Sequence, residues 1–573
     1  MKQTVFFCVL CVLLLLLTLS CLGDMLPASG IGVSSSAESA DALPPQEAPQ
    51  AVPVFSHTSG SYTETSLTVT VRAPEGYTIA YTTDGTLPAG EQDSGLSEVS
   101  VLLEKTGSGL LADNRDLMIY PEFVQSYLFS DETLPSGRVL NVSLVGPDGS
   151  LRPPVTNVYF LGTDFSELYP DCLVVSVTAD PGAFLDYETG ILAAGVHYDR
   201  WKQTDAAAEA IASHSMYLLE SNSTMRGKAW ERPCLVQIYD SENRPAAEAY
   251  AGIRVHGNAS RRFNQKGFNL YFRNEYGTGP LSFPLFGGKA SWDVFSLSNG
   301  GNATDRLKYR NDLLLELASD RDFAVMRSRP AVLFLNGEYW GPYSLTEKIT
   351  QEALSERFGV DEKQVVVIKA GQLELGKNSD MALYKELNAY AQMDLSNPET
   401  YGRFCEVMDV QSMADYFAAC VYIGNADFAP DRNTILWRTR DDSFNGGRWQ
   451  YILYDTEFCA GLYNINDTAA STDHFRIAME KHPLFAAAIR NESFYAMFLQ
   501  ALKEIGSQNY APERVEAALA SYDRVWLPLM PDFRKRFGEP LWKWEVDRDD
   551  FIRFFRERYD LIIPLAESWQ DTF

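Results

Sequence analysis

Four side chains with carboxylate or amide oxygens stand in a short loop of this sequence, between a helix-like stretch and two strand-like stretches. The loop, NADFAPDRN, supplies Asn425, Asp427, Asp431 and Asn433. Another carboxylate, Asp455, ends the second strand-like stretch. Carboxylate and amide oxygens are ligands that suit Mg²⁺, and a remaining carboxylate can accept the proton of a hydroxyl group. The residue types therefore predict a cation site with an adjacent base, provided that the fold returns Asp455 to the loop.

The stretches around the loop predict how its side chains are brought together. In QSMADYFAACVYIG, residues 411–424, apolar residues recur at helical spacing, which predicts a helix with one buried face. TILWRTR and RWQYILYD, joined by a turn rich in Asp, Asn and Gly, predict a β-hairpin. Because a hairpin ends near where it begins, we expect Asp455 beside the loop. The alternative is that Asp427 forms a local Asx turn and Asp455 only ends a strand.

The order of these parts is that of the catalytic half of protein kinases: a helix, an Asp-to-Asn loop, a hairpin and a second Asp. Asn433 follows Asp427 by six positions where kinases have about five, and the HRD and DFG phrases are absent. A neighbouring phrase is more specific. FLNGEYWGPYSLTE, residues 334–347, resembles a phrase of the CotH kinase family, the spore coat protein H group of atypical kinases, almost letter for letter. Its Asn-Gly pair also predicts a tight hairpin.

A second phrase, HGNASRRFNQKG, combines a turn with cationic side chains, which suits phosphate oxygens. The family's words G-x-S-S-R and K-S match Gly257, Ser260, Arg261 and Lys266, with departures at positions 259 and 267. The resemblance implies that Ser260, Arg261 and Lys266 hold the phosphates of ATP. Without it, Lys266 is interpreted as a surface lysine at the start of a strand. Glu347 is predicted to pair with Lys266, as a kinase glutamate does, or else to stay exposed.

The resemblance also implies a metal ion and a catalytic base. Mg²⁺, or Mn²⁺, would be held by Asp455, Asn433 and Glu457, while Asp427 would orient the acceptor hydroxyl group. The family phrase after the hairpin is D-x-D, whereas this chain has D-T-E, and Phe428 stands where the family has Trp. A chain that keeps the fold without turnover is the alternative that these departures leave open.

An R-N-D trio, Arg310 to Asp312, lies in a helix predicted from about Asp305 and also recurs in the family. The alternative to a functional role is a solvated helix turn with local ion pairs, which contribute little to stability.

The first residues predict export. Lys2 precedes a short apolar run, and Leu19, Ser20 and Cys21 resemble a lipoprotein box, in which Cys21 is lipidated and anchors the chain outside the cytoplasm. Plain secretion is the alternative. Residues 22–53, rich in Ser, Ala and Pro, predict a flexible linker.

The rest of the chain predicts a multidomain fold. Residues 54–162 alternate in short strands with turns, and YTTDGTLP and VTNVYF resemble the immunoglobulin-like module at the C-terminus of chitobiases and hexosaminidases. This small all-β sandwich is expected to act as a spacer or to contact cell-wall carbohydrate. Residues 170–573 predict an α+β bilobal, atypical protein-kinase-like domain, with a mixed lobe to about 375 and a mainly helical lobe over 376–573.

Net charge and cysteine spacing argue against some classes of function. A net charge of −27 and a pI near 4.7 argue against binding to nucleic acid. The cysteines that follow Cys21 are odd in number and lack metal-ligand spacing, so they predict small buried side chains rather than a zinc site or a disulfide framework. They are Cys172, Cys234, Cys405, Cys420 and Cys459.

The sequence therefore predicts an exported, membrane-anchored atypical kinase that uses Mg²⁺ to transfer the γ-phosphoryl group of ATP to Ser or Thr of a protein. The sequence does not identify that protein substrate. The alternative, from another class, is a catalytically inactive relative that serves as a surface-binding or envelope-structural protein.

Overall fold

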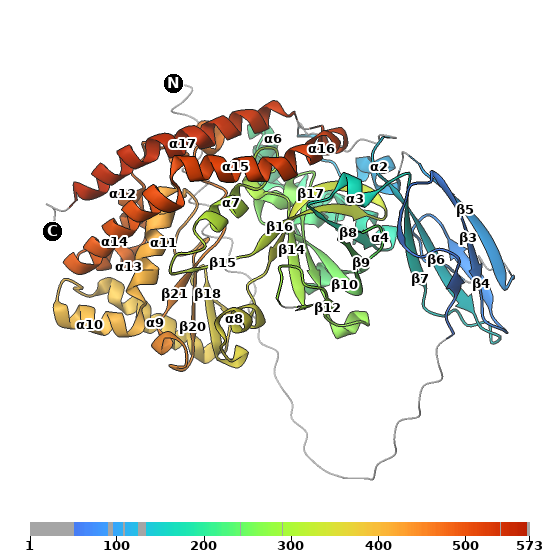
Figure 1. The fold of residues 1–573 in the computed structure, drawn as a ribbon, viewed down its shortest axis with the longest axis horizontal. Coiled ribbons are helices and arrows are strands. Elements are labelled where there is room, and N and C mark those ends of the chain that lie inside the picture. The colour runs from blue at the N-terminus through green and yellow to red at the C-terminus, as the bar shows by residue number, and fades with distance from the viewer. Residues whose placement is uncertain are drawn as a thin grey trace, which may run out of the picture. The chain divides into compact units, whose positions relative to one another are not determined.

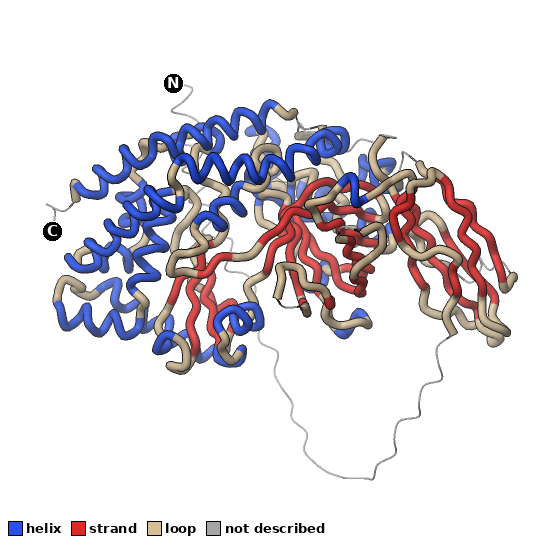
Figure 2. Tube along the Cα trace, in the orientation of Figure 1, coloured by secondary structure: helices blue, strands red, loops and turns tan. Residues whose placement is uncertain are grey.

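The computed structural model describes residues 51–89, 95–106, 109–123, 133–240, 242–288, 290–538 and 540–569. Cys21, the predicted signal peptide and the linker up to residue 50 lie outside the described residues. Within the described ranges, no helix has the length and apolarity needed to cross a membrane. Figure 1 labels the elements, and Figure 2 shows strands prevailing in the N-terminal part and helices in the C-terminal part. Several sheets followed by a helical region make a multidomain α+β protein.

The first elements form two sheets that share one core. Their bounds are β1 Val54–Phe55, β2 Gly60–Tyr62, β3 Ser66–Arg72, β4 Thr78–Thr82, β5 Glu98–Glu104, β6 Gly137–Val145 and β7 Val155–Leu161. One sheet has the order β1-β3-β5 and the other β2-β7-β6-β4. In β5, buried Val99, Val101 and Leu103 alternate with exposed residues, as the two-residue period of a strand requires. They pack in one cluster with Leu140 and Val142 of β6.

A closed barrel follows. Its strands, in the order in which they pair, are β10 Ala247–His256, β11 Gly267–Tyr271, β14 Val294–Ser298, β17 Glu338–Glu347, β16 Ser328–Leu335, β8 Leu173–Thr178 and β9 Arg232–Tyr239. Side chains such as Val255, Phe268 and Leu297 fill its interior. The hairpin predicted at Asn336 and Gly337 is confirmed: β16 pairs with β17, and both turn residues have positive φ, 47° and 78°.

A second sheet carries the predicted hairpin. It has the order β15-β21-β20-β18-β19, with bounds β15 Ala324–Val325, β21 Gln450–Leu453, β20 Ile435–Thr439, β18 Val365–Lys369 and β19 Gln372–Leu375. β20 and β21 pair antiparallel, so the predicted hairpin is confirmed. β18 pairs with β20, so the sheet joins strands from both sides of the lobe boundary predicted near residue 375.

Helices surround this sheet. From residue 310 onward the α-helices are α7 Arg310–Leu317, α8 Gln351–Phe358, α9 Met381–Ala389, α10 Pro398–Val407, α11 Val410–Tyr422, α12 His474–Lys481, α13 Pro483–Ala488, α14 Glu492–Glu504, α15 Pro512–Trp526, α16 Met530–Phe537 and α17 Trp542–Glu567. α11, the helix predicted before the loop, is buried along nearly its whole length and packs against β21, α14 and α17. Asp409 caps its N-terminus by accepting hydrogen bonds from the backbone N–H groups of Gln411 and Ser412.

The remaining elements are short. They are α2 Leu110–Asp113, α3 Phe165–Leu168, α4 Pro181–Leu185, α5 Gly195–Trp201, α6 Asp205–Ser213, β12 Leu281–Ser282 and β13 Ser291–Trp292. The start of α2 is fixed to the barrel, because the Glu338 carboxylate accepts hydrogen bonds from the backbone N–H groups of Leu111 and Ala112, at 2.5 and 3.1 Å. Phe160 of β7 packs on Phe334 of β16, so the first two sheets contact the barrel through apolar side chains.

The cysteines of the described residues are all free, and all are buried except Cys405, which is half-buried. Their placement in apolar surroundings agrees with the interpretation as small core side chains.

Candidate functional site

The loop after α11 holds Asp427 in a network of its own residues. The backbone N–H of Asp427 donates to Asn425 Oδ1 at 3.0 Å. Its carboxylate accepts hydrogen bonds from Arg432 Nη1 at 3.2 Å and from Asn433 Nδ2 at 3.1 Å. Burial raises the pKa of Asp427, Arg432 opposes that rise, and the charge of Asp455 adds to it. The backbone N–H of Ala426 donates to the carbonyl oxygen of Phe458 at 3.1 Å, so the loop lies against the segment that carries Asp455 and Glu457.

Asp455 and Glu457 form a carboxyl pair where the chain leaves β21. Asp455 has a positive φ of 58°, and its carboxyl group shares a hydrogen bond with that of Glu457. Burial raises the pKa of Glu457 well above its usual range, and the adjacent Asp455 raises it further. The backbone N–H of Asn302 also donates to Glu457. A divalent cation would replace the proton that these two carboxyl groups share, and would bind an oxygen of each.

A glycine makes room for this pair. Gly301 has a positive φ of 53°, and a Cβ atom on it would lie 2.0 Å from Oε1 of Glu457. A side chain at position 301 would therefore displace the carboxyl group.

The donor set fits Mg²⁺ better than a metal bound only by protein. Within the described ranges, no three His, Cys, Asp or Glu side chains gather in the manner of a metal site. Mg²⁺ usually keeps several waters and takes one or two carboxylates together with substrate phosphates. Asp455 and Glu457 can supply these carboxylates. The amide nitrogen of Asn433 donates to Asp427, so only its amide oxygen is suited to a cation.

The barrel turns a polar face outward. Arg254, Asn269, Ser296 and Thr346 stand opposite one another in register across β10, β11, β14 and β17. Ser296 Oγ donates to Asn269 Oδ1 at 2.6 Å. These positions alternate with core residues on every strand, so they lie on the opposite side of the sheet from the barrel interior.

Cations gather beside this polar face. Burial, followed by the charges of Lys348 and Lys369, lowers the pKa of His256 to about 3. Burial and the adjacent Lys369 likewise lower the pKa of Lys348 to about 8. Among the described residues, neither His256 nor Lys348 has a side-chain hydrogen bond or ion pair. Lys369 Nζ lies 3.4 Å from Tyr454 Oη. Lys369 also stands level with Ile435 and Ile452 across β18, β20 and β21, three positions before Asp455.

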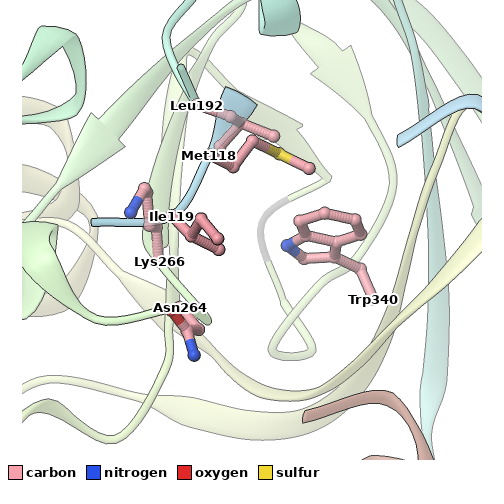
Figure 3. A pocket seen from close by; sticks show the side chains of 6 residues that line it. All are labelled: Met118, Ile119, Leu192, Asn264, Lys266 and Trp340. Carbon is pink, nitrogen blue, oxygen red and sulfur yellow. The ribbon is translucent and has the colours of Figure 1, made fainter. Parts of the chain in front are cut away.

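Lys266 lies elsewhere, at an inner end of the barrel. It is 2% exposed, stands two positions before the core residue Phe268, and donates from Nζ to the carbonyl oxygen of Phe263 at 2.9 Å. Burial lowers its pKa, and its Nζ is 5.7 Å from the ring centre of Tyr120. Figure 3 shows it lining a small pocket across from Trp340. The interpretation of Lys266 as a surface lysine is therefore wrong.

The pair predicted between Lys266 and Glu347 is not formed. Glu347 instead makes ion pairs with Arg327 at 2.6 Å and Arg357 at 2.7 Å. The register explains this. Glu347 stands level with Leu270 through Phe295, four positions along the strand from Lys266, or roughly 13 Å at the usual rise per residue.

Ser260 and Arg261 belong to the turn after β10. Gly257 has a φ of 105°, and a Cβ atom on it would lie 2.1 Å from Ser260 Oγ. Arg261 is buried, and it donates to the carbonyl oxygens of Gly257 at 2.6 Å and Met225 at 2.8 Å. Burial and the adjacent Arg226 lower the pKa of Arg261 to about 10. Its guanidinium group therefore braces the turn, while its charge still lies near His256.

The R-N-D trio is not a solvated helix turn. Arg310 is 0% exposed and Asp312 is 5% exposed, and the trio contacts residues far away in the sequence. The alternative of local ion pairs is therefore wrong. The partners come from β17, α17 and the segment after Asp455, which local sequence could not reveal.

Sequence reasoning missed Lys348, Lys369 and Gly301. A signal for the first existed, because the polar residues Ser344, Thr346 and Lys348 recur at every second position across the end of β17. A strand with one polar and one apolar face directs its polar residues away from a core. The Gly-Gly pair in SNGGN, residues 298–302, was likewise a signal for close approach by another segment.

A family model matches more than half of the chain. The model described as CotH kinase protein matches residues 253–562, from within β10 to near the end of α17. The match includes the carboxyl pair, Asp427, Lys348 and Lys369, and it begins after the first two sheets. Among curated proteins, no match was found.

Proposed function

The chain belongs to the CotH kinase protein family, and from this premise we propose that it is an exported, membrane-anchored atypical kinase, which transfers the γ-phosphoryl group of ATP to Ser or Thr of a protein. The observation that carries the proposal is that the loop of Asp427 is hydrogen-bonded to the segment that follows Asp455 and Glu457, with Lys369 in the same sheet. Phosphoryl transfer requires carboxylates that hold a metal ion, a base for the acceptor hydroxyl group, and positively charged side chains that contact the phosphates.

Each side of the site has a distinct task in this proposal. Asp455 and Glu457, with the amide oxygen of Asn433, would hold Mg²⁺ or Mn²⁺, which neutralises charge on the phosphate oxygens when bound. Asp427 accepts the proton of the acceptor hydroxyl group. Its raised pKa makes it a stronger base than an exposed carboxylate, and Arg432 orients it.

The phosphate contacts are assigned to Lys348 and Lys369 instead of Lys266. Burial and the charges of Lys369 and Arg254 lower the pKa of Lys348, and only Glu374 opposes them. Lys348 has no side-chain partner among the described residues, so an anion would stabilise its charge. Lys266 is held by a carbonyl oxygen and an aromatic ring within the core. Ser260 and Arg261 keep a supporting role, because the turn that they form adjoins His256.

Export and anchoring are proposed from the sequence alone. Cys21 would carry the lipid, and the first two sheets would serve as a spacer or contact cell-wall carbohydrate. A Cys21→Ser variant should lose incorporation of labelled palmitate and leave the membrane fraction. Equal incorporation in both proteins would contradict the lipid anchor.

The activity is tested with the purified protein, Mg²⁺ and γ-labelled ATP. We expect label on the protein itself or on added protein substrates, and at least a hundredfold less with Asp455→Ala or Asp427→Asn. Asp441→Asn is the matched control, because Asp441 is an exposed carboxylate at the far end of the same hairpin. Absence of label, or label unchanged by the first two substitutions, would favour an inactive surface-binding or envelope-structural protein.

A further inference from the structure

The first turn of α7 contacts the segment that carries the carboxyl pair. Resting on the proposed function, we infer that Asn311 is a positioning residue, which fixes the backbone from Asp455 to Glu457 so that both carboxyl groups face one cation. Arg310 and Asp312, on either side of it, fix the same segment to α17 and to the barrel.

Asn311 is bonded to the residue between the two acids. Its Oδ1 accepts hydrogen bonds from the backbone N–H of Thr456 at 2.9 Å and from Thr456 Oγ1 at 3.1 Å. Thr456 is fully buried, so without Asn311 its N–H would be left without a partner away from water. Asp455 has a positive φ of 58°, a conformation that residues other than Gly adopt at a cost in backbone strain. The bonds from Asn311 hold the chain in this conformation.

Arg310 holds the far end of the segment. Its Nη1 donates to the carbonyl oxygens of Cys459 at 3.1 Å and Ala460 at 3.0 Å. Its Nη2 donates to Asp547 of α17 at 2.6 Å, and both side chains are buried. Adjacent residues of one helical turn thus bind the segment before and after Glu457.

Asp312 connects this turn to the barrel. Ser344 of β17 donates to its carboxylate, and Ser328 of β16 and Asn311 also form hydrogen bonds with it. Lys348 directly follows β17 and stands four positions after Ser344. The turn therefore joins the carboxyl pair to the strand that leads to Lys348, and sets how far the cation site lies from the proposed phosphate contacts.

This arrangement predicts an effect on affinity for a cation, separate from folding. Outer partners of metal ligands typically change metal affinity by about 10- to 100-fold when they are removed. Asn311→Ala keeps both carboxylates but frees the backbone between them. We expect the Kd for Mn²⁺, measured by electron paramagnetic resonance with a non-hydrolysable ATP analogue present, to rise at least tenfold.

Two further variants separate positioning from folding. Thr456→Val has the same shape as threonine and loses only one of the two hydrogen bonds, so its Kd should rise less, and adding it to Asn311→Ala should change little. The matched control is Asn509→Ala. Asn509 is a buried asparagine that donates to the carbonyl oxygen of Leu317, at the other end of α7, at 2.8 Å. It should lower the melting temperature and leave the Kd for Mn²⁺ unchanged.

The outcomes are distinct. A wild-type Kd for Mn²⁺ in folded Asn311→Ala, or an equal rise with Asn509→Ala, would overturn the positioning role while the proposed function stands. Wild-type protein that binds no Mn²⁺ at all would overturn both. If Asn311→Ala fails to fold, an unchanged Kd in Thr456→Val overturns the proposal and a raised one supports it.

Discussion

Two lysines on opposite sides of the barrel wall show how surroundings decide the role of a cation. Lys266 lies at the inner end, bonded to a carbonyl oxygen and placed over Tyr120 among apolar residues. Lys348 lies by the outer face, near His256, Lys369 and Arg254, with no side-chain partner among the described residues. Burial lowers the pKa of both. A buried ammonium group with hydrogen-bond partners is stable within a core. One whose neighbouring charges are mostly positive favours an anionic ligand.

The largest expected effect comes from exchanging each lysine for methionine. Lys348→Met should lower kcat/KM for Mg·ATP a hundredfold to a thousandfold with little change in melting temperature, because it removes charge from the phosphate side. Lys266→Met should change kcat/KM less than threefold, since a buried cation can often be replaced by an apolar side chain of similar size. Steady-state kinetics on both variants would decide. The reverse order of effects would break the comparison.

The next effect concerns Glu347, predicted from the sequence to pair with Lys266. Glu347→Gln leaves Arg327 and Arg357 without their shared carboxylate, so the free energy of unfolding should fall by about 3 kcal/mol. The Kd for Mg·ATP should not change, because these groups are not among the assigned phosphate contacts. Urea unfolding and calorimetric titration measure the two quantities. A larger Kd for Mg·ATP with an unchanged free energy of unfolding would show that Glu347 belongs to the nucleotide site.

Asp312 provides a smaller, pH-dependent test of the link between the barrel and the carboxyl pair. Burial raises its pKa from 3.8 to about 6, so the folded state binds this proton more tightly than the unfolded state. Its contribution to stability is present below about pH 4 and is lost as the pH rises through 6. The shift corresponds to about 2 to 3 kcal/mol.

Asp312→Asn should remove this part of the pH dependence. Urea midpoints at pH 4, 5, 6 and 7 should show the wild type losing stability relative to the variant as the pH rises. Parallel curves for the two proteins would show that Asp312 does not titrate in this range.

The smallest effect is the pH dependence of nucleotide binding at Lys348. Its pKa is about 8, so the group loses its charge as the pH rises through that value. The Kd for Mg·ATP should then increase, approaching tenfold per pH unit above pH 8. In Lys348→Met the same plot should be flatter. A wild-type Kd that is constant from pH 7 to 10 would contradict the assignment.

Local patterns were enough to predict the carboxylate side of the site. The helical spacing of residues 411–424 and the paired strands after Thr434 fix where the loop starts and where Asp455 returns, because both arguments concern neighbours in sequence. The same holds for the Asn336–Gly337 turn, which only needs two residues of positive φ.

The cation side depended on contacts that local patterns do not contain. Whether Lys266 or Lys348 lies on the outer side of the barrel follows from the register in which the barrel strands pair, and from the closure of the barrel. The burial of Arg310 depends on Asp547, a separation of 237 positions. The polar residues at every second position across the end of β17 were a usable signal for Lys348, but the resemblance to the family motif favoured Lys266.

The most direct test of the proposed site is a crystal structure with Mn²⁺ and an ATP analogue that cannot transfer its γ-phosphoryl group. We expect an anomalous peak within about 2.5 Å of the carboxylates of Asp455 and Glu457. The triphosphate should lie toward Lys348 and Lys369, with the γ-phosphate near Asp427. A nucleotide whose phosphates lie beside Lys266, or a metal peak away from Asp455, would contradict it.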